Sequence, residues 1–269
     1  PYLFFDNPYV DNIYTDVTDE IKETHEVFVS FNIEYHPNGI CYKHNAMDIR
    51  QFHAINLGFM LTKDEMEMDY IPKPIDTIEG LPEKYVLIHP VQNWDSRTWD
   101  AKKWQMLTKL LNERGIAVVS IGKDSSELGG SNVDKPVFNF EIEKGLNLMN
   151  KTNISDCWNL ISRARCFITM DSGLLHLAGT TDTTIVHLGS SIKPEFRIPY
   201  RNGGRQDYKY AYVRGGCGLE CGSNAKYGIK EWGNVQGVAP LIKCLENKKN
   251  FECHPSTEQV FDVLKQYIL

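Results

Sequence analysis

The stretch CFITMDSGLLHLAG, residues 166–179, organises the rest of this chain. Its first residues are apolar or β-branched, which is typical of a strand buried on both faces of a parallel sheet. Asp171, Ser172 and Gly173 then form a polar turn, and Asp and Ser are favoured at helix N-caps. A helix is predicted from Leu174 onward, and the free N–H groups at its start would suit a diphosphate at the carboxyl edge of the sheet. An ordinary capped connection between a strand and a helix is the alternative.

The composition is that of a globular protein without unusual bias. The 269 residues are 42% hydrophobic and 24% charged, and the formal net charge is −6. This mildly acidic balance argues against a nucleic-acid partner, and no apolar run is long enough for a membrane span. No signal peptide is recognisable, although the chain begins at Pro1 without a methionine.

Predicted strands and helices alternate after residue 80. The predicted strands are Tyr85–His89, Ile116–Ile121, Val137–Phe140, Phe167–Met170 and Thr184–Leu188, and the predicted helices are Lys102–Arg114, Ser155–Arg163, Leu174–Gly179 and Thr257–Tyr267. Asn153 or Ser155 is the expected cap of the second helix. This alternation predicts a doubly wound α/β sheet.

The first 70 residues are less regular. A helix is predicted within residues 45–61, because apolar residues recur there at roughly helical spacing. Pro72 and Pro74 stiffen the stretch Ile71–Gly80, which has little to bury and is predicted to be a linker between domains. The expected domains are a partial N-terminal α/β domain over residues 1–70, the linker over residues 71–80 and a C-terminal Rossmann-like domain over residues 81–269.

Two other predicted strands end in polar residues that should share the sheet edge of the first turn. Arg97 lies in the turn that spans residues 89–99, where a guanidinium can bind a phosphate through two parallel hydrogen bonds. A solvated loop arginine is the alternative. Trp94 and Trp99 in the same turn are candidates to flank a nucleotide base or a sugar. Lys123, after the next strand, is expected at the surface.

Four of the seven cysteines lie in the last quarter of the chain: Cys217, Cys221, Cys244 and Cys253. Four thiolates suit the tetrahedral coordination of zinc or iron, so this cysteine-rich loop, residues 217–253, is a candidate metal site. Free buried thiols are the alternative, and His254 is a substitute ligand if one cysteine takes no part. The other three cysteines are scattered, which favours a reducing cytoplasm over a secreted disulfide framework.

These motifs resemble those of the family 9 glycosyltransferases, the bacterial heptosyltransferases. In residues 85–104 a strand ends in His-Pro, and a basic residue and a tryptophan precede the next helix. The Asp-Ser-Gly-Leu-Leu-His motif at Asp171–His176 is the most specific likeness. Asn147–Thr152, residues 189–199 and Asn7–Asp11 are similar to further family loops. The resemblance covers most of residues 81–269 and, more weakly, residues 1–70.

The resemblance implies a GT-B-like α/β fold of two Rossmann-type domains, the first of them incomplete in this chain, with the active site between them. The C-terminal domain would bind a nucleotide-diphospho-sugar similar to ADP-heptose, and the acceptor would be a glycan or a protein. The implied donor-binding residues are Arg97, Thr98, Asp171, Ser172, Gly173 and His176. Fixed N–H groups, a helix N-terminus and a cation can stabilise the leaving diphosphate without a metal ion.

The family's transfer inverts the anomeric carbon and needs a base on the acceptor side. The catalytic base is unknown here, because the family's Gly-rich loop and catalytic Asp lie at the start of the first domain and nothing before Asn7 matches them. Either an N-terminal segment is missing from the sequence or the first domain is degenerate. Asp11, Asp48 and His44 are titratable residues of this part, and none is assigned the role.

The C-terminal region is similar to that of a subgroup, the autotransporter heptosyltransferases, in which four cysteines hold an iron ion. Phe251-Glu252-Cys253 and the Thr-Glu-Gln-Val helix after it also resemble the ending of that subgroup. The resemblance implies a structural iron or zinc ion at the four cysteines and no organic cofactor. The sequence leaves open whether the chain forms a homo-oligomer.

The sequence therefore favours a cytoplasmic, inverting glycosyltransferase that moves a sugar, heptose by resemblance, from a nucleotide-diphospho-sugar to a glycan or protein. The first alternative is a non-catalytic nucleotide-sugar-binding or scaffold protein derived from that fold. The second is another enzyme with two Rossmann domains, such as a nucleotide-sugar epimerase.

Overall fold

A computed structural model describes residues 10, 12, 14, 18–24, 48–75, 77–90, 95–123, 141–223, 244 and 251–268. Its centre is a six-stranded parallel sheet of order β3-β2-β1-β4-β5-β6. The strands are β1 (Tyr85–Ile88), β2 (Ala117–Ser120), β3 (Gly145–Asn147), β4 (Cys166–Thr169), β5 (Thr184–Leu188) and β6 (Tyr210–Val213). This is the strand order of a doubly wound Rossmann-type sheet, and it reverses between β1 and β4.

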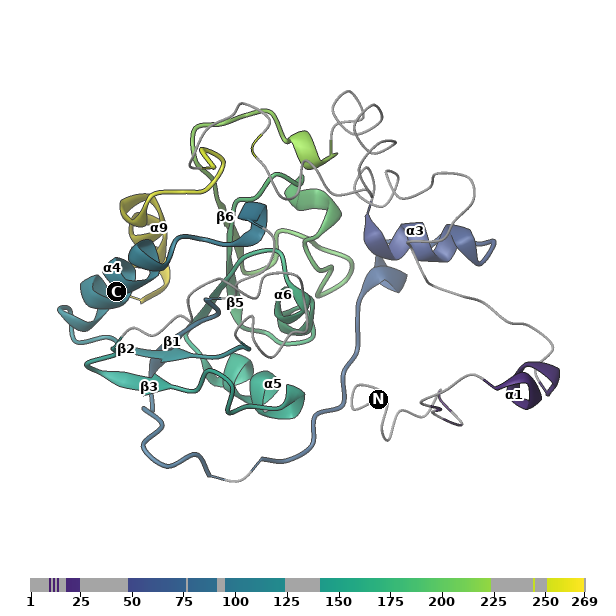
Figure 1. The fold of residues 1–269 in the computed structure, drawn as a ribbon, viewed down its shortest axis with the longest axis horizontal. Helices are drawn as coiled ribbons and strands as arrows, with labels where there is room; N and C mark the ends of the chain where they lie inside the picture. The colour runs from purple at the N-terminus through teal and green to yellow at the C-terminus, as the bar shows by residue number, and fades with distance from the viewer. Residues whose placement is uncertain are drawn as a thin grey trace.

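Helices cover both faces of the sheet. α4 (Ala101–Asn112) and α9 (Thr257–Ile268) lie on one side, and α5 (Ile154–Arg163) and α6 (Gly173–Ala178) lie on the other (Figure 1). α1 (Asp19–Glu23) and α3 (Ile49–Asn56) precede the sheet in the chain. Single 3-10 turns are η2 (Asp64–Met66), η3 (Asp95–Arg97), η4 (Pro194–Phe196) and η5 (Cys221–Ser223).

Two apolar cores hold these layers together. Successive strand residues point to opposite faces, so Ile88 and Ile168 pack with α4 and α9, whereas Leu87 and Phe167 pack with α5 and α6. β1, β2 and β4 are buried along their whole length. This double burial explains why their sequences are apolar runs without alternation.

The sequence predicts most of these elements to within five residues. Strands β1, β2, β4 and β5 and helices α3, α4, α5, α6 and α9 are confirmed, as is Asn153 as the N-cap of α5. β3 and β6 are not predicted, because both are edge strands, mostly only partly buried, and lack the fully buried pattern of the inner strands. The predicted strand Val137–Phe140 lies outside the described residues.

The stretch predicted to be a linker carries no helix or strand in its described residues, but it is attached to the sheet domain. Ser155 Oγ lies 2.8 Å from Tyr70 Oη and accepts the Lys73 N–H at 3.3 Å. Ile78 packs against the core on the side of α5 and α6. The expectation that this stretch buries little is therefore wrong for Ile78.

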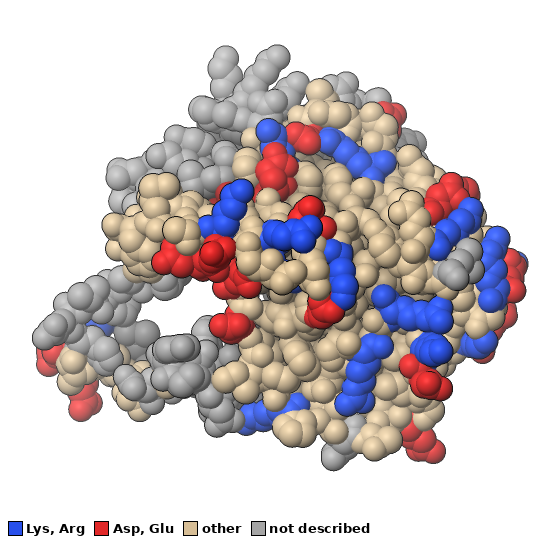
Figure 2. Space-filling view, turned by 180° about the vertical axis from the view of Figure 1, so that it is seen from behind, with Lys and Arg blue, Asp and Glu red and all other residues tan. Residues whose placement is uncertain are grey.

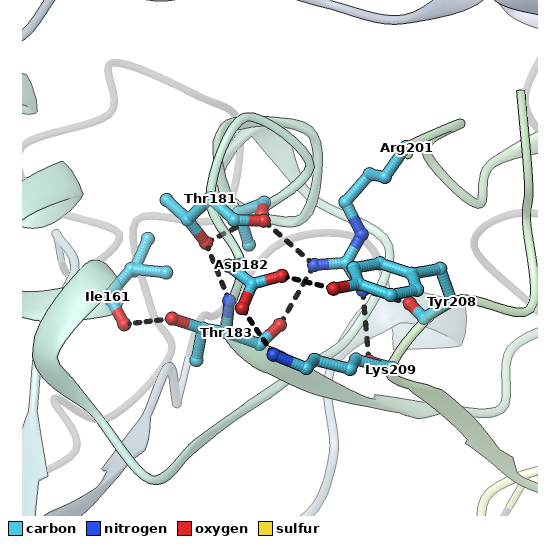
Figure 3. Close-up of polar contacts among 8 residues, drawn as sticks. Ile161, Thr181, Asp182, Thr183, Arg201, Tyr208 and Lys209 are labelled. Carbon is cyan, nitrogen blue, oxygen red and sulfur yellow. Dashed lines mark hydrogen bonds and ion pairs between the residues drawn. The ribbon is translucent and has the colours of Figure 1, made fainter. Parts of the chain in front are cut away.

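A buried arginine fixes the connection between β5 and β6. Arg201 is 5% exposed and donates to the carbonyls of Thr181 and Thr183 at 3.0 and 2.9 Å. On its other side it donates to the carbonyls of Tyr208 and Lys209 (Figure 3). One guanidinium thus joins the end of the α6 connection to the start of β6, and it anchors the far end of the loop that follows β5.

Neither a membrane-spanning helix nor, on the face drawn in Figure 2, a continuous basic stripe is found among the described residues. No helix in the described residues is both long and apolar enough to cross a membrane. On the face shown in Figure 2, basic and acidic side chains lie next to one another. Such mixing differs from the continuous basic stripe of a nucleic-acid interface.

Candidate functional site

The site lies where the strand order reverses, between the carboxyl ends of β1 and β4. His89 follows β1, and its N–H donates to the Ile168 carbonyl at 2.9 Å. Its ring Nδ1 lies 3.0 Å from Thr169 Oγ1 and 3.2 Å from Ser172 Oγ. Ligands of doubly wound folds bind at this point of the sheet, so the polar turn predicted from the sequence is in the expected place.

His89 ties the two strand ends together as a neutral group. Burial lowers the pKa of His89 to about 3, so the ring is neutral, and its tautomer sets whether Nδ1 donates to or accepts from the hydroxyl groups beside it. The ring also lies against Gly122, where a Cβ would approach it to 2.7 Å. The sequence marks His89 only as part of a strand-end motif and assigns it no role.

The helix after β4 begins as predicted, with Ser172 as the cap. Ser172 Oγ accepts the Leu175 N–H at 3.4 Å, so the cap is Ser172 and not Asp171. Gly173 opens α6, and a Cβ added there would meet nothing within 4 Å. The first N–H groups of a helix have no partner within the helix, and here the space beside its first residue is open.

Asp171 is buried between two arginines. Its Oδ2 lies 3.2 Å from Arg97 Nη2 and 3.3 Å from Arg197 Nε, and the residue is 3% exposed. Burial alone would raise the pKa of Asp171, but Arg97 and Arg197 outweigh it and lower the pKa to about 2. The carboxylate is therefore charged, and one negative and two positive groups leave a net positive charge beside the start of α6.

Two histidines, the buried His187 and the partly buried His176, complete the Asp171 cluster, which consists of Arg97, Asp171, His176, His187 and Arg197. Burial lowers the pKa of His176 and of His187 to about 4, so both rings are neutral at pH 7. His187 Nδ1 lies 2.6 Å from Tyr210 Oη. In the described part of the chain, His187 Nε2 and His176 Nδ1 have no hydrogen-bond partner. Because buried polar atoms are normally paired, these nitrogens are suited to a polar ligand or a water molecule.

Arg197 comes from the loop after β5, and the sequence does not identify it as a site residue. Pro199 in the same loop approaches Gly179 so closely that a Cβ at Gly179 would lie 2.2 Å from it. The loop is therefore held in register with the end of α6. The only sequence signal is that Arg197 falls within residues 189–199, one of the stretches that carry the family resemblance.

Helix α3 also contacts the loop that carries Arg197. Arg50 pairs with its own N-cap residue, Asp48, at 2.5 Å and donates to the Ile198 carbonyl at 2.7 Å. Its guanidinium also lies 4.9 Å from the centre of the Tyr200 ring. Part of the chain before residue 71 thus contacts the loop that carries Arg197, whereas Asp11 and His44 lie outside the described residues.

The aromatic prediction for the Arg97 turn is wrong for Trp99. Trp99 is fully buried, packs edge to face on Trp104 with ring centres 4.8 Å apart, and donates from Nε1 to the Pro255 carbonyl at 2.9 Å. It is a core residue and cannot flank a ligand. Trp94 lies outside the described residues, Thr98 beside Arg97 is partly buried, and Lys123 is exposed as predicted.

The four late cysteines surround one small cavity. Cys217, Cys221, Cys244 and Cys253 line a space of about 20 Å³ together with Ser191, Leu219, Glu220, Phe251 and Glu252. A space of this size holds about one water-sized particle. All four thiols are free, and no three His, Cys, Asp or Glu side chains among the described residues are arranged to hold a metal ion. The sequence therefore predicts which cysteines gather, and the metal stays a prediction.

Backbone contacts hold the two sides of this cysteine cavity together. The Gly215 N–H donates to the Cys253 carbonyl at 2.9 Å, and a Cβ at Gly215 would lie 2.1 Å from the Glu252 oxygen. Burial, with a contribution from the nearby Cys221 and Cys217, raises the pKa of Cys253 to about 12. His254, the expected substitute ligand, does not line the cavity.

Comparison with known proteins identifies the type of fold and family. A family model described as "Glycosyltransferase family 9 (heptosyltransferase)" matches residues 47–206. Curated relatives include lipooligosaccharide heptosyltransferase 2 of Haemophilus influenzae, 26% identical over 104 residues, which are 39% of this chain and 30% of the relative. Lipopolysaccharide heptosyltransferase 3 of Escherichia coli K12 is 27% identical over 149 residues, 55% of this chain and 43% of the relative. The matched part spans less than half the length of these relatives.

One solved structure with a similar fold is TibC of enterotoxigenic E. coli H10407, described as an iron-containing dodecameric glycosyltransferase. The TM-score is 0.55 at 18% identity, over 83% of this chain and 54% of TibC. Another TibC structure, with the same similarity, is described as a heptosyltransferase in complex with ADP-D-β-D-heptose. At this level of identity the likeness shows a shared fold.

Proposed function

The chain belongs to glycosyltransferase family 9, the heptosyltransferase family, and from this premise we propose that it transfers heptose from a nucleotide-diphospho-sugar, ADP-heptose, to a glycan or protein acceptor. The observation that carries the proposal is the Asp171 cluster at the point where the strand order reverses. The names of the relatives support the sugar, and the ligand of TibC supports the nucleotide.

The cluster suits a leaving diphosphate. Negative charge grows on the diphosphate as the glycosidic bond breaks, and fixed donors at that position lower the barrier. The Ser172 and Gly173 N–H groups and the Arg97 guanidinium supply such donors, with Thr98 beside them. Asp171 holds Arg97 and Arg197 in place, and His176 lies close to the phosphate or the sugar as a neutral group.

We further propose the GT-B arrangement for this reaction. Residues 81–269 form the donor domain, residues 71–80 the linker, and residues 1–70 part of the acceptor-side domain. The transfer inverts the anomeric carbon, and its base comes from the acceptor side. Asp48 is paired with Arg50 and is not assigned that role. The reaction takes place in the cytoplasm, where the free thiols stay reduced.

Binding of ADP and of ADP-heptose, measured by calorimetry, tests the proposal. We expect Arg97→Ala to weaken binding at least tenfold, because it removes a charge-assisted contact worth about 1.5 to 3 kcal/mol. Lys123→Ala, at an exposed position after the next strand, should leave the affinity unchanged. A wild-type chain that binds neither ligand would contradict the proposal. Binding without transfer would favour the scaffold alternative, and release of free sugar or an epimer without acceptor would favour an epimerase.

We also propose a structural iron or zinc ion in the cysteine cavity. The donor set fits in kind, because four thiols line one small space and sulfur ligands favour these metals, although the described side chains are not arranged around an ion. TibC, the relative in fold, is described as iron-containing and dodecameric, which also supports a homo-oligomer here. Elemental analysis should find about one metal ion per chain, and Cys217→Ser should abolish it. Metal-free wild-type protein would overturn this proposal.

A further inference from the structure

The segment that carries Cys253 also holds the turn that carries Arg97. His254 Nε2 lies 2.9 Å from the Ser96 carbonyl oxygen. Because a carbonyl only accepts, Nε2 carries the proton and donates it. The His254 ring is 8% exposed and stacks on Phe251 with ring centres 5.1 Å apart. The imidazole is thus held on one side by packing and on the other by this hydrogen bond.

The next residue provides a second anchor on the same turn. The Pro255 carbonyl accepts a hydrogen bond from Trp99 Nε1 and another from Lys103 Nζ, each at 2.9 Å. Ser96 and Trp99 stand on the two sides of Arg97 in the sequence. The Arg97 turn is therefore tied to His254 through the Ser96 backbone before the arginine, and to Pro255 through the Trp99 side chain after it.

The position of the Arg97 guanidinium depends on this backbone. Arg97 ends a single 3-10 turn and pairs at 3.2 Å with Asp171, which precedes the N-cap of α6, and 15% of its side chain is exposed. A small displacement of a binding group is enough to weaken catalysis strongly. Whatever fixes Ser96 and Trp99 thus fixes the point from which Arg97 meets a ligand.

We propose that His254 is a positioning residue of the donor site, which holds the Ser96–Trp99 turn so that Arg97 can bind the diphosphate. This inference rests on the proposed function of Arg97 and assigns His254 a role other than metal ligand. The histidine does not touch the donor; it acts through the backbone of the turn.

Hydrogen exchange of the full chain without ligand tests the contact itself. We expect His254→Leu to speed exchange about tenfold in peptides from residues 95–104. His254→Gln, whose amide can still donate to Ser96, should restore most of the protection. Tyr85→Phe is the matched control: it removes a buried hydrogen bond of 2.7 Å to the Leu160 carbonyl on the opposite face of the sheet, and it should leave these peptides unchanged. Unchanged exchange in His254→Leu would overturn the inference.

Affinity for ADP then tests whether the histidine acts through Arg97. His254→Leu should raise the Kd for ADP about tenfold, and Tyr85→Phe should not. In an Arg97→Ala background, His254→Leu should have no further effect, whereas an equal loss in both backgrounds would overturn the inference. Faster exchange in His254→Leu together with a wild type that binds no ADP would have two meanings. It would support the contact between His254 and the Arg97 turn, and it would contradict the proposed function.

Discussion

The Asp171 cluster and the cysteine cavity both follow the carboxyl ends of parallel strands, but different forces hold them. In the Asp171 cluster, a buried carboxylate pairs with two guanidinium groups that come from separate loops. The cysteine cavity is joined by backbone contacts such as those of Gly215, and its thiols are free. Fixed charges therefore preorganise the first region, whereas the second would gain its rigidity from a bound ion. Acid should therefore destabilise the Asp171 cluster, and a metal chelator should destabilise the cysteine cavity.

The largest effect should come from mild acid. Burial lowers the pKa of His89 to about 3 and those of His176 and His187 to about 4. The unfolded chain takes up these protons near pH 6.5, whereas the folded chain resists them until about pH 4. Stability is thus fully present only well above pH 6.5, and these three groups lower it by roughly 5 kcal/mol between pH 7 and pH 5. His254, whose pKa burial also lowers to about 4, adds roughly 2 kcal/mol to this loss.

Urea denaturation at the two pH values measures this loss. Asp171, with a pKa of about 2, stays charged throughout this range and is lost as a stabilising group only below about pH 4. His187→Gln should reduce the slope of the free energy of unfolding against pH by the equivalent of about one proton. A free energy of unfolding that is constant between pH 7 and pH 5 would contradict the assignment of neutral buried histidines.

The next largest effect should come from Asp171→Asn. The substitution leaves two guanidinium groups without their carboxylate in a buried site, which should cost about 4 kcal/mol. Affinity for ADP should fall as well, because Arg97 loses its orientation. Asp262→Asn is the control: its pair with Lys265 at 2.6 Å is exposed, so the change should be about 0.5 kcal/mol or less. Equal losses in the two variants would show that burial does not strengthen the Asp171 pairs.

Metal removal should have a smaller effect on stability, confined to the cysteine cavity. A chelator should lower the unfolding temperature by about 5 °C, which corresponds to about 2 kcal/mol for a chain of this size. Cys253→Ser should show the same decrease and no further response to the chelator, and it should keep the histidine-dependent loss in acid. A chelator effect of the same size in Cys253→Ser would place the metal elsewhere.

The smallest effect should come from the ion pairs at the rim of the cavity. Glu220 pairs with Arg214 at 2.8 Å and with Lys193 at 4.0 Å, and all three side chains are 20–38% exposed. Glu220→Gln should change the free energy of unfolding by about 1 kcal/mol or less and leave the metal content intact. Loss of the metal in this variant would show that the rim, and not only the thiols, holds the site.

The sequence predicts the part of the Asp171 cluster that is local in the chain and, through the strand-end pattern and the family resemblance, also Arg97. Asp171, Ser172 and His176 belong to one strand–turn–helix stretch, so hydrophobic pattern and capping residues are enough to place them. Arg197 and His187 join the cluster only through the path of the loop after β5 and the pairing of β5 with β4. No local pattern encodes such long-range contacts.

The misassigned Trp99 has the same physical cause. In the sequence, a tryptophan in a polar turn resembles a ligand-binding residue. Contacts with the Pro255 carbonyl and with Trp104 instead hold Trp99 in the core. The cysteines were easier to predict, because four thiols within a short stretch have few other ways to be buried together. Their cavity nevertheless depends on the close approach of Gly215 to Glu252, which the sequence shows only as one of several glycines.

Gly179 has a consequence for the evolution of this family. Its backbone is ordinary helical, with φ at −62°, so any residue could adopt that conformation, yet a Cβ would lie 2.2 Å from Pro199. A homologous sequence with a side chain at this position must route the loop that bears Arg197 along another path. In an alignment, the residue at position 179 therefore indicates which homologues can share this loop geometry.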